Sequence, residues 1–489
     1  MSTRPQLAPI RFGTDGWRAV IANEFTFANV ERVAQAYAQY VLRERESARV
    51  SKPREPQDQS GAGAPFVVVG YDRRFLSDQF AARAAQVLAG NGVAVEMFDG
   101  DVPTPVVSWA VRDRGASGGV VITASHNPAE FNGFKIKAAW GGSATPETTR
   151  AVETLVDAAP VSRGELTAGT HARLAPSVKS YREQINSYVD LGRLRAARGR
   201  VVVDPIHGAG GRWVESFLAG GALEVETIRS ERDPTFGGVA PEPIDRNLAP
   251  LRGRVSERGA LVGLATDGDA DRVGAVNELG ETMTMHEVVP LVLLHLARGR
   301  GMTGGVVRTF SQSVLTKRIA AAHGLKLHET PIGFKYVADL MLREDILIGA
   351  EESGGIGVKG HLPERDGILN SLLFLEAVVA SGRTPSEMVR EMHREFGEFY
   401  FGRRDLTCGV GRGLGLVAGL AQSPPARIGE WDVTSVEKLD GTKLLFADES
   451  WLLFRQSGTE PMLRIYAEAT SVAKRESLLE AGAELAARK

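Results

Sequence analysis

Ser125 stands where a buried strand is expected to end. An apolar run at residues 120–122 precedes it, and small, turn-forming residues follow at 123–128. In open α/β sheets, binding and catalytic groups usually lie at such strand ends. Lys135 follows ten residues later, after a second turn signal at Asn132-Gly133. Two interpretations of this segment are equally favoured by its sequence alone. One is a reactive serine, and the other is a surface loop with a hydrogen-bonded serine and histidine.

Three carboxylates follow another apolar run, residues 261–265, at every second position: Asp267, Asp269 and Asp271. Carboxylates this close repel one another unless a cation neutralises them, and Mg²⁺ prefers oxygen ligands. An EF-hand is the competing interpretation, since Glu278 falls at the twelfth position. Arg272, however, stands at the sixth position, where that loop needs glycine. The spacing predicts a Mg²⁺ site, with a solvated acidic turn as the simple alternative.

Two glycine-rich loops carry groups suited to a phosphorylated sugar. Residues 349–355 follow an apolar strand, and Glu351 and Ser353 offer hydrogen-bonding groups for vicinal hydroxyls. Residues 455–461 combine an arginine, two hydroxyls and backbone N–H groups, which a phosphate dianion requires. A helix entry and a hairpin turn are the respective alternatives. Together, the four loops suggest a nucleophile, a metal, a sugar and a phosphate, which indicates a phosphosugar enzyme.

The composition is that of an ordinary globular protein. A chain of 489 residues is too long for one hydrophobic core, so we expect three or four domains. Its net charge of -2 provides no overall attraction for nucleic acid or an anionic membrane. The single cysteine, Cys408, excludes an internal disulfide, and no signal peptide or membrane span is evident. We expect a cytoplasmic protein.

Strand, loop and helix patterns recur along the chain. Strands are predicted at residues 66–72, 201–204 and 306–309, each within a unit of similar size that also contains a helix. Residues 159–176 read as a polar connection and residues 51–64 as a flexible surface insertion. The pattern predicts three similar mixed α/β domains.

The C-terminal quarter has a different pattern. Residues 451–455 and 462–467 read as antiparallel strands joined by a tight loop. A closing helix at residues 472–487 is expected to face a sheet through three leucines: Leu478, Leu479 and Leu485. We predict a separate α+β domain.

The four motifs, in this order over almost the whole chain, resemble those of the α-D-phosphohexomutase family, the phosphoglucomutases and phosphomannomutases. They are TASHNP at 123–128, DGDADR at 267–272, GAEESGG at 349–355 and RQSGTEP at 455–461. The resemblance implies four domains around a central cleft, carrying the phosphoserine, metal, sugar-binding and phosphate-binding loops in turn. Their expected limits are 1–170, 171–281, 282–396 and 397–489.

The resemblance also implies roles for individual residues. Ser125 would carry a phosphoryl group and, with the three aspartates, hold Mg²⁺. Lys135 matches the family's general base, which would need a depressed pKa. The remaining catalytic candidates are His126, Arg272 and Arg18. The substrate-binding candidates are Glu351, Ser353, Gly333, Lys335, His361, Arg455, Ser457, Gly458, Thr459 and Arg464.

The implied reaction interconverts glucose 1-phosphate and glucose 6-phosphate, with glucose 1,6-bisphosphate as intermediate and activator. Gly355 replaces a histidine that is common in related enzymes that use both mannose and glucose and in the glucosamine enzymes, and residues 333–335 resemble the glucose type. The alternatives are a mutase for mannose, glucosamine or pentose phosphates, a non-catalytic phosphosugar-binding protein, and a phosphatase. The expected partner is a hexose phosphate rather than nucleic acid or membrane, and the expected assembly is a monomer or homodimer.

Overall fold

The computed structural model describes residues 9–13, 15–51, 65–168, 171–175, 178–457 and 461–488. The chain forms two units. The first comprises Met1–Gly274 and Gly360–Leu372, and the second comprises Ala275–Lys359 and Leu373–Lys489. Most of the insertion predicted at residues 51–64, together with Gly458 and Thr459, lies outside the described residues.

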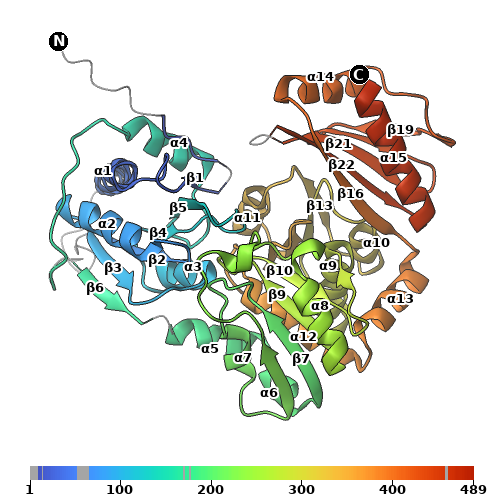
Figure 1. Cartoon of the computed structure of the whole chain (residues 1–489), viewed down its shortest axis with the longest axis horizontal. Helices are drawn as coiled ribbons and strands as arrows, with labels where there is room; N and C mark the ends of the chain where they lie inside the picture. Colours follow the sequence, from blue (N-terminus) through green and yellow to red (C-terminus); the bar gives the residue numbers. More distant parts are fainter. Residues whose placement is uncertain are drawn as a thin grey trace. The chain divides into compact units, whose positions relative to one another are not determined.

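The first unit begins with a six-stranded mixed sheet in the order β1-β5-β4-β2-β3-β6 (Figure 1). Strands β2, β3, β4 and β6 are parallel, whereas β5 is antiparallel to both of its neighbours. The strands are β1 (Trp17–Val20), β2 (Phe66–Tyr71), β3 (Ala94–Phe98), β4 (Gly118–Ile122), β5 (Phe131–Lys137) and β6 (His171–Leu174). The helices are α1 (Phe27–Ser51), α2 (Ser77–Gly90), α3 (Thr104–Asp113) and α4 (Pro146–Leu155).

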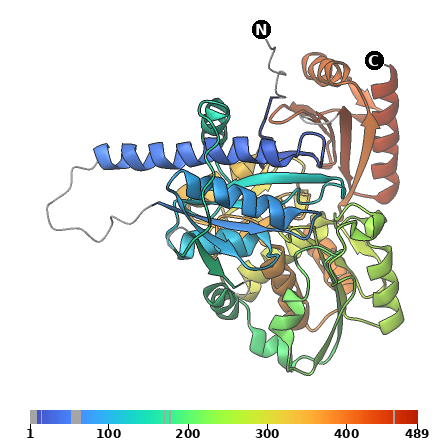
Figure 2. The same ribbon diagram turned by 60° about the vertical axis from the view of Figure 1, so that its left-hand side comes forward.

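Both faces of this sheet are covered. Val67 and Val69 of β2 belong to the core that includes residues of α1 and α2, which lie side by side (Figure 2). The alternate position Gly70 faces α3, because a Cβ there would come within 2.4 Å of Val107. A central strand buried on both faces has a continuous apolar run, which is why β2 and β4 could be predicted.

Two local predictions are wrong. The predicted polar connection at 159–176 contains β6, an edge strand with mostly exposed side chains. This segment is a strand because its backbone pairs with β3. Its sequence has no alternation of apolar residues from which that pairing could be predicted. Asn132 and Gly133 lie inside β5, where a turn was expected. Gly133 is needed because a Cβ would lie 2.4 Å from the Thr123 carbonyl oxygen.

The rest of the first unit is a second α/β domain. Its parallel strands are β7 (Gly199–Asp204), β8 (Leu223–Thr227) and β9 (Val262–Thr266). Strands β7 and β9 confirm the strands expected there, whereas β8 was not predicted. Strand β10 (Val273–Val276) carries the chain into the second unit. The α-helices are α5 (Lys179–Tyr188), α6 (Leu191–Ala196), α7 (Trp213–Leu218) and α8 (Ala249–Arg258).

The second unit contains a third mixed sheet in the order β13-β12-β14-β15. Its strands are β12 (Gly305–Thr309), β13 (Leu327–Thr330), β14 (Ile346–Ala350) and β15 (Ile356–Val358), and the short β11 (Thr282–Met283) pairs with the end of β10. The helices of this region are α9 (Met285–Leu294), α10 (Val314–Ala322), α11 (Phe334–Arg343), α12 (Gly367–Ser381) and α13 (Pro385–Phe396).

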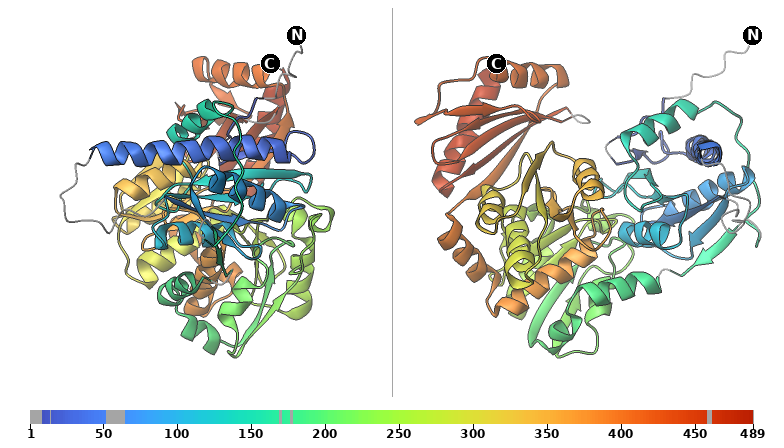
Figure 3. Two further views of the ribbon diagram at one scale, coloured as in Figure 1. Left: turned by 90° about the vertical axis from the view of Figure 1, so that its left-hand side faces the viewer. Right: turned by 180° about the vertical axis from the view of Figure 1, so that it is seen from behind.

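The C-terminal domain is built on an antiparallel sheet in the order β16-β22-β21-β20-β19. Its strands are β16 (Tyr400–Thr407), β19 (Ser435–Glu437), β20 (Thr442–Leu445), β21 (Trp451–Gln456) and β22 (Met462–Ala469), with a separate pair β17 (Arg427–Ile428) and β18 (Trp431–Asp432). Helices α14 (Val410–Gln422) and α15 (Val472–Arg488) complete it. Helix α15 lies along the sheet (Figure 3). Leu478 and Leu479 are buried in the core and Leu485 is partly buried against it, as predicted.

The predicted fold class of three mixed α/β domains and a C-terminal α+β domain is confirmed. In the described part of the chain, the helices lack the combination of length and apolarity that crossing a membrane requires.

Candidate active site

Ser125 lies just beyond the end of β4, buried and in a strained backbone conformation. Its φ of 53° is in the left-handed region, which is uncommon for residues other than glycine. The Ser125 N–H donates to Thr123 Oγ1 at 2.9 Å, and the hydroxyl donates to Asp267 Oδ2 at 2.8 Å. His126 Nδ1 lies 3.3 Å from the same hydroxyl. The serine is therefore held against the acidic loop.

The three aspartates follow β9 and are all buried. One oxygen from each of the three side chains lies within 4.8 Å of the others. Asp267 Oδ1 accepts the N–H groups of Asp271 and Arg272, and Asp269 Oδ2 accepts the Thr104 hydroxyl at 2.7 Å. Oδ1 of Asp269 and Oδ1 of Asp271 have no hydrogen-bond partner among the described residues.

This donor set fits a hard divalent cation. Burial raises the pKa of Asp267 well above its ordinary value, and the charges of Asp271 and Asp269 raise it further. The two carboxylate oxygens without a hydrogen-bond partner, on Asp269 and Asp271, are buried, and carboxylate oxygens are the ligands that Mg²⁺ prefers. The aspartates predicted as metal ligands are suitably placed for that role.

Lys135 lies on β5 and is fully buried among carboxylates. Its Nζ lies 2.8 Å from Asp269, 3.3 Å from Asp271 and 2.9 Å from Asp15. Burial alone lowers the pKa of Lys135, but the three carboxylates outweigh burial and raise that pKa above its ordinary value. Asp15, the third of these carboxylates, was not predicted from the sequence, and the general-base role of Lys135 stays a prediction.

A further group of charges joins this cluster and was not predicted. Arg365 lies 2.7 Å from Asp15 and 3.0 Å from Asp271. Next to it, the Glu364 carboxylate accepts hydrogen bonds from Lys137 at 3.0 Å and from the Ser143 hydroxyl at 2.7 Å. The available signals were weak: Glu364 and Arg365 belong to a charged triplet before α12, and Asp15 belongs to the glycine-rich turn at residues 12–18.

The remaining catalytic candidates also lie in this region. Arg18 donates to Asn127 Oδ1 at 2.7 Å, and Arg272 Nη1 lies 3.5 Å from Glu242. Burial and then the positive charges of Arg272 and Arg18 hold the pKa of His126 well below its ordinary value. The region around His126 therefore contains positive charge from Arg272 and Arg18 and favours the neutral imidazole.

In the second unit, the predicted sugar-binding residues lie after β14 and at the start of α11. Glu351 is buried, and its N–H donates to the Gly355 carbonyl at 3.0 Å, which closes the loop around Ser353. Gly333 has a φ of 138° and precedes the first turn of α11. Lys335 lies in that turn, with its ammonium 4.9 Å from the centroid of the Tyr336 ring.

The predicted phosphate-binding arginines face each other in the C-terminal sheet. Arg455 on β21 pairs in register with Arg464 on β22, and like charges at such positions are unfavourable unless an anion lies nearby. Asp440 lies 3.0 Å from Arg455 and also accepts the Ile332 N–H at 2.8 Å, just before Gly333. Ser457 closes the described part of the hairpin through its N–H, which donates to the Met462 carbonyl at 2.9 Å.

His361, which was predicted to bind the substrate, is enclosed by other side chains of the first unit. It lies in the first unit, with Nε2 3.0 Å from Asp366 and its ring stacked on Trp109 at 5.3 Å between centroids. Its side chain is 1% exposed. Neighbours that the sequence alone did not place enclose the imidazole, and its role in substrate binding stays a prediction.

Comparison with known proteins agrees with this architecture. Models of the phosphoglucomutase/phosphomannomutase family match the chain in four parts: alpha/beta/alpha domain I at 9–161, domain II at 179–280, domain III at 285–396 and the C-terminal domain at 425–485. A phosphoglucomutase/phosphomannomutase of Thermococcus kodakarensis is 31% identical over 474 residues, covering 97% of this chain and 98% of the relative.

Two other relatives carry different names. A phosphoglucosamine mutase of Moorella thermoacetica is 34% identical over 337 residues, covering 67% of this chain and 73% of the relative. A crystal structure from Thermus thermophilus, provisionally named a phosphomannomutase, is 37% identical with a TM-score of 0.85, covering 98% of this chain and 99% of that one. The chain belongs to the phosphoglucomutase/phosphomannomutase family of phosphohexomutases.

Proposed function

We propose that this protein interconverts glucose 1-phosphate and glucose 6-phosphate through phosphorylated Ser125 and a glucose 1,6-bisphosphate intermediate. The observation that carries the proposal is the Ser125 hydroxyl, 2.8 Å from Asp267 within a buried group of three aspartates. A solvated acidic turn or a simple surface loop would not bury a serine and three carboxylates together. Family membership supports the same reaction class.

The groups of the first unit would carry out phosphoryl transfer. The phosphoryl group passes from Ser125 Oγ to the oxygen of a sugar hydroxyl, so one P–O bond breaks as another forms, and the proton of that hydroxyl ends on Ser125 Oγ. Such transfers depend mainly on position and charge stabilisation. Asp267, Asp269 and Asp271 would hold Mg²⁺, with the serine oxygen beside it, and the ion would reduce the negative charge on the phosphoryl oxygens.

Cationic side chains would share this task. Arg272 and Arg18 supply positive charge near His126, whose imidazole is neutral. The ion pairs of Lys135 favour its ammonium form, so we assign it to holding Asp269 and Asp271 and to adding positive charge. A general-base role for Lys135 would require loss of a proton that these ion pairs retain.

The groups of the second unit would recognise the substrate. Glu351 and Ser353 would bind sugar hydroxyls, assisted by Gly333 and Lys335. The other phosphate of the sugar would be held by Arg455, Ser457 and Arg464, together with Gly458 and Thr459 by resemblance. The two ends of the sugar must exchange places during turnover, because the second phosphate has to return to Ser125.

The preference for glucose is argued from two loops. Gly355 stands where, by resemblance, enzymes that use both mannose and glucose and the glucosamine enzymes commonly have a histidine, and residues 333–335 resemble the glucose type. The relatives are named for glucose, mannose and glucosamine phosphates, so the family alone leaves several sugars open. One inverted hydroxyl is a small difference for a polar site to reject, which makes some activity on mannose phosphate an expected outcome.

The experiment combines intact mass spectrometry with a substrate panel. Incubation with glucose 1,6-bisphosphate and Mg²⁺ should add one phosphate, mapped to Ser125. Coupled assays should then give a higher kcat/KM for glucose 1-phosphate than for the mannose, glucosamine and pentose 1-phosphates. A higher kcat/KM for another sugar 1-phosphate would show that this sugar, and not glucose, is the preferred substrate. Free phosphate released faster than isomer would indicate a phosphatase, and no phosphate uptake on Ser125 would reject the phosphoserine route.

A further inference from the structure

We propose that Arg74 is a positioning residue for Ser125. Its guanidinium holds the loop that carries the serine, and Asp72 holds the guanidinium. The proposal rests on the proposed function of Ser125 as phosphoryl carrier. Both residues follow β2, the strand that pairs with β4, and neither was singled out from the sequence.

Arg74 bonds to the serine loop at four backbone positions. Nη2 donates to the carbonyls of Ser125 and Asn127 at 2.6 and 2.5 Å, and Nη1 donates to those of Pro128 and Phe131 at 2.7 and 2.9 Å. The Arg74 side chain is 0% exposed. Buried carbonyls without donors are costly, so one guanidinium satisfies much of the loop's need for hydrogen bonds.

Arg74 and Asp72 together form what we call the clamp. Asp72 connects Arg74 to the N–H of Ser125 through Thr123. Asp72 Oδ2 lies 3.2 Å from Arg74 Nε and accepts the Thr123 hydroxyl at 2.6 Å. Thr123 Oγ1 in turn accepts the Ser125 N–H at 2.9 Å. Asp72 Oδ1 accepts the Arg74 N–H and the Ser77 hydroxyl, which fixes the carboxylate. Ser125 is thus held at both its N–H and its carbonyl.

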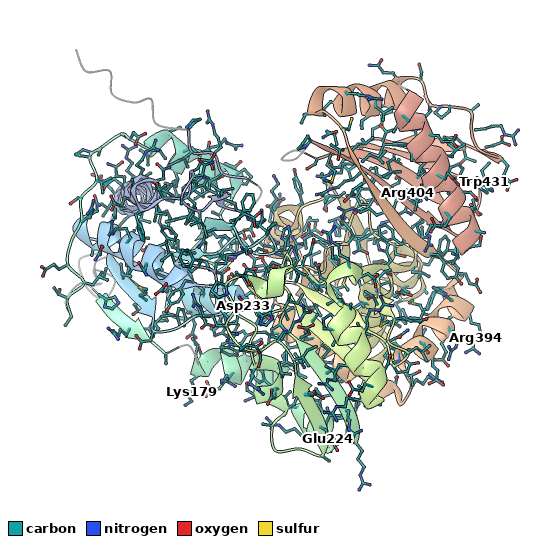
Figure 4. All side chains as sticks on the ribbon, viewed as in Figure 1. Lys179, Glu224, Asp233, Arg394, Arg404 and Trp431 are labelled. Carbon is teal, nitrogen blue, oxygen red and sulfur yellow. The ribbon has the colours of Figure 1, made fainter. Side chains whose placement is uncertain are left out.

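The second α/β domain covers the clamp. Phe236 lies with its ring centroid 4.9 Å from the Arg74 guanidinium carbon. Asp233, labelled in Figure 4, accepts the N–H groups of Thr235 and Gly237 and so fixes the turn that presents Phe236. An aromatic ring over a buried guanidinium favours the charged form and excludes water.

Ser125 needs such a clamp because its backbone is strained. A serine at φ 53° persists only where surrounding contacts hold it there. A planar guanidinium can donate to four carbonyls in fixed directions, whereas a lysine ammonium has at most three donors on a flexible stem. Arg74→Lys therefore keeps the charge opposite Asp72 but cannot keep the loop fixed.

A matched control lies in the second α/β domain. Asp204 ends β7 as Asp72 follows β2, and its Oδ1 accepts both the Ile206 N–H and Arg229 Nε. Arg229 also donates to the Asn247 carbonyl. The contacts of Arg229 are with Asp204 and Asn247 rather than the serine loop. Arg229→Lys thus disturbs a similar buried ion pair of the same unit.

The experiment compares the full-length wild type with Arg74→Lys, Thr123→Val and Arg229→Lys. The readouts are hydrogen–deuterium exchange of peptides covering residues 121–131, the rate of Ser125 phosphorylation by glucose 1,6-bisphosphate, and kcat and KM. Arg74→Lys should raise loop exchange at least about 10-fold and lower the phosphorylation rate and kcat about 10- to 100-fold, with KM within about 3-fold. Thr123→Val, which keeps side-chain shape, should change them in the same direction by less.

Arg229→Lys should leave loop exchange and kcat within about 2-fold of wild type. Equal loop exchange and equal phosphorylation rates in wild type and Arg74→Lys would overturn the proposal. If Arg74→Lys does not fold, Thr123→Val decides by the same readouts. Wild type that takes up no phosphate would reject the proposed function, whereas the exchange measurement would still test whether Arg74 holds the loop.

Discussion

The candidate catalytic charges of the first unit are more deeply buried than the candidate phosphate-binding charges of the second. In the first, Lys135 and Asp269 are 0% exposed and bonded to one another. In the second, the candidate phosphate-binding pair Arg455 and Asp440 remains 19% and 23% exposed. The first unit also binds Arg365 from a segment, Gly360–Leu372, whose sequence neighbours belong to the second unit.

This difference corresponds to two chemical tasks. Groups that stabilise a transferring phosphoryl group gain from a fixed geometry in surroundings of low dielectric constant. Groups that bind a substrate present in both ground and transition states must admit it and release it. Changes in the first unit should therefore lower kcat, and changes in the candidate binding loops of the second should raise KM.

Ser125→Ala should have the largest effect. Removing the proposed phosphoryl carrier should lower kcat roughly 10⁴-fold or more, with sugar phosphate binding largely retained. Kinetics and intact mass after incubation with glucose 1,6-bisphosphate provide the test. Ser187→Ala, on the exposed side of α5, serves as control. Normal turnover of Ser125→Ala would show that Ser125 is not the phosphoryl carrier, and the first unit would then not be the unit that reacts.

Asp269→Asn should come second. It removes one carboxylate from the predicted metal site and one ion-pair partner of Lys135, so kcat should fall roughly 10²-fold or more and lose its dependence on Mg²⁺. Mg²⁺ should raise the Tm of wild type but not of the variant. The exposed Glu224, labelled in Figure 4, gives the control Glu224→Gln. An unchanged Mg²⁺ response in Asp269→Asn would contradict the assignment.

Arg455→Ala tests the other half of the comparison. Its target phosphate is bound in ground and transition states alike, so KM should rise about 10- to 100-fold while kcat changes little. Arg404→Ala provides the control, since Arg404 (Figure 4) lies on β16 with its side chain 41% exposed. A large fall in kcat at constant KM would place Arg455 with the reacting groups instead.

The smallest effect on activity is expected for Glu364→Gln. Burial raises the pKa of Glu364, but Lys137 and Arg365 outweigh burial and hold it at about 2, below the ordinary 4.5. The carboxylate thus stabilises the fold above pH 4.5, by about 3 kcal/mol at pH 7, and this stabilisation disappears as the pH falls toward 2. The Tm difference from wild type should shrink over that range.

Asp448 in the second unit sharpens this comparison. Its pKa is also held at about 2, where Lys474 and Ser450 outweigh burial, but its side chain is 38% exposed. Asp448→Asn should lower Tm less than Glu364→Gln, and its effect should decrease more with added salt. Equal decreases in Tm with equal salt dependence would show that burial does not make the Glu364 carboxylate more stabilising than that of Asp448.

The sequence determined the elements that carry the candidate site. Each motif follows an apolar run that the structure confirms as a strand, notably β4 before Ser125, β9 before Asp267 and β14 before Glu351. These patterns are local, because the apolar residues of each strand and the turn-forming residues after it lie within about ten residues of each other. They can therefore be recognised without knowing the tertiary structure. The edge strand β6 escaped detection since its pairing with β3 leaves no such pattern.

Only the tertiary structure decided which charges meet. Asp15 and Arg365 are 350 residues apart in the chain yet lie 2.7 Å from one another. Asp15 also contacts Lys135, and its carboxylate is one of three that raise the pKa of that lysine. Packing on Trp109 likewise encloses His361, and Arg74 proved to hold the serine loop. A sequence specifies which groups are present, but electrostatic energy depends on distances and burial that long-range packing alone sets.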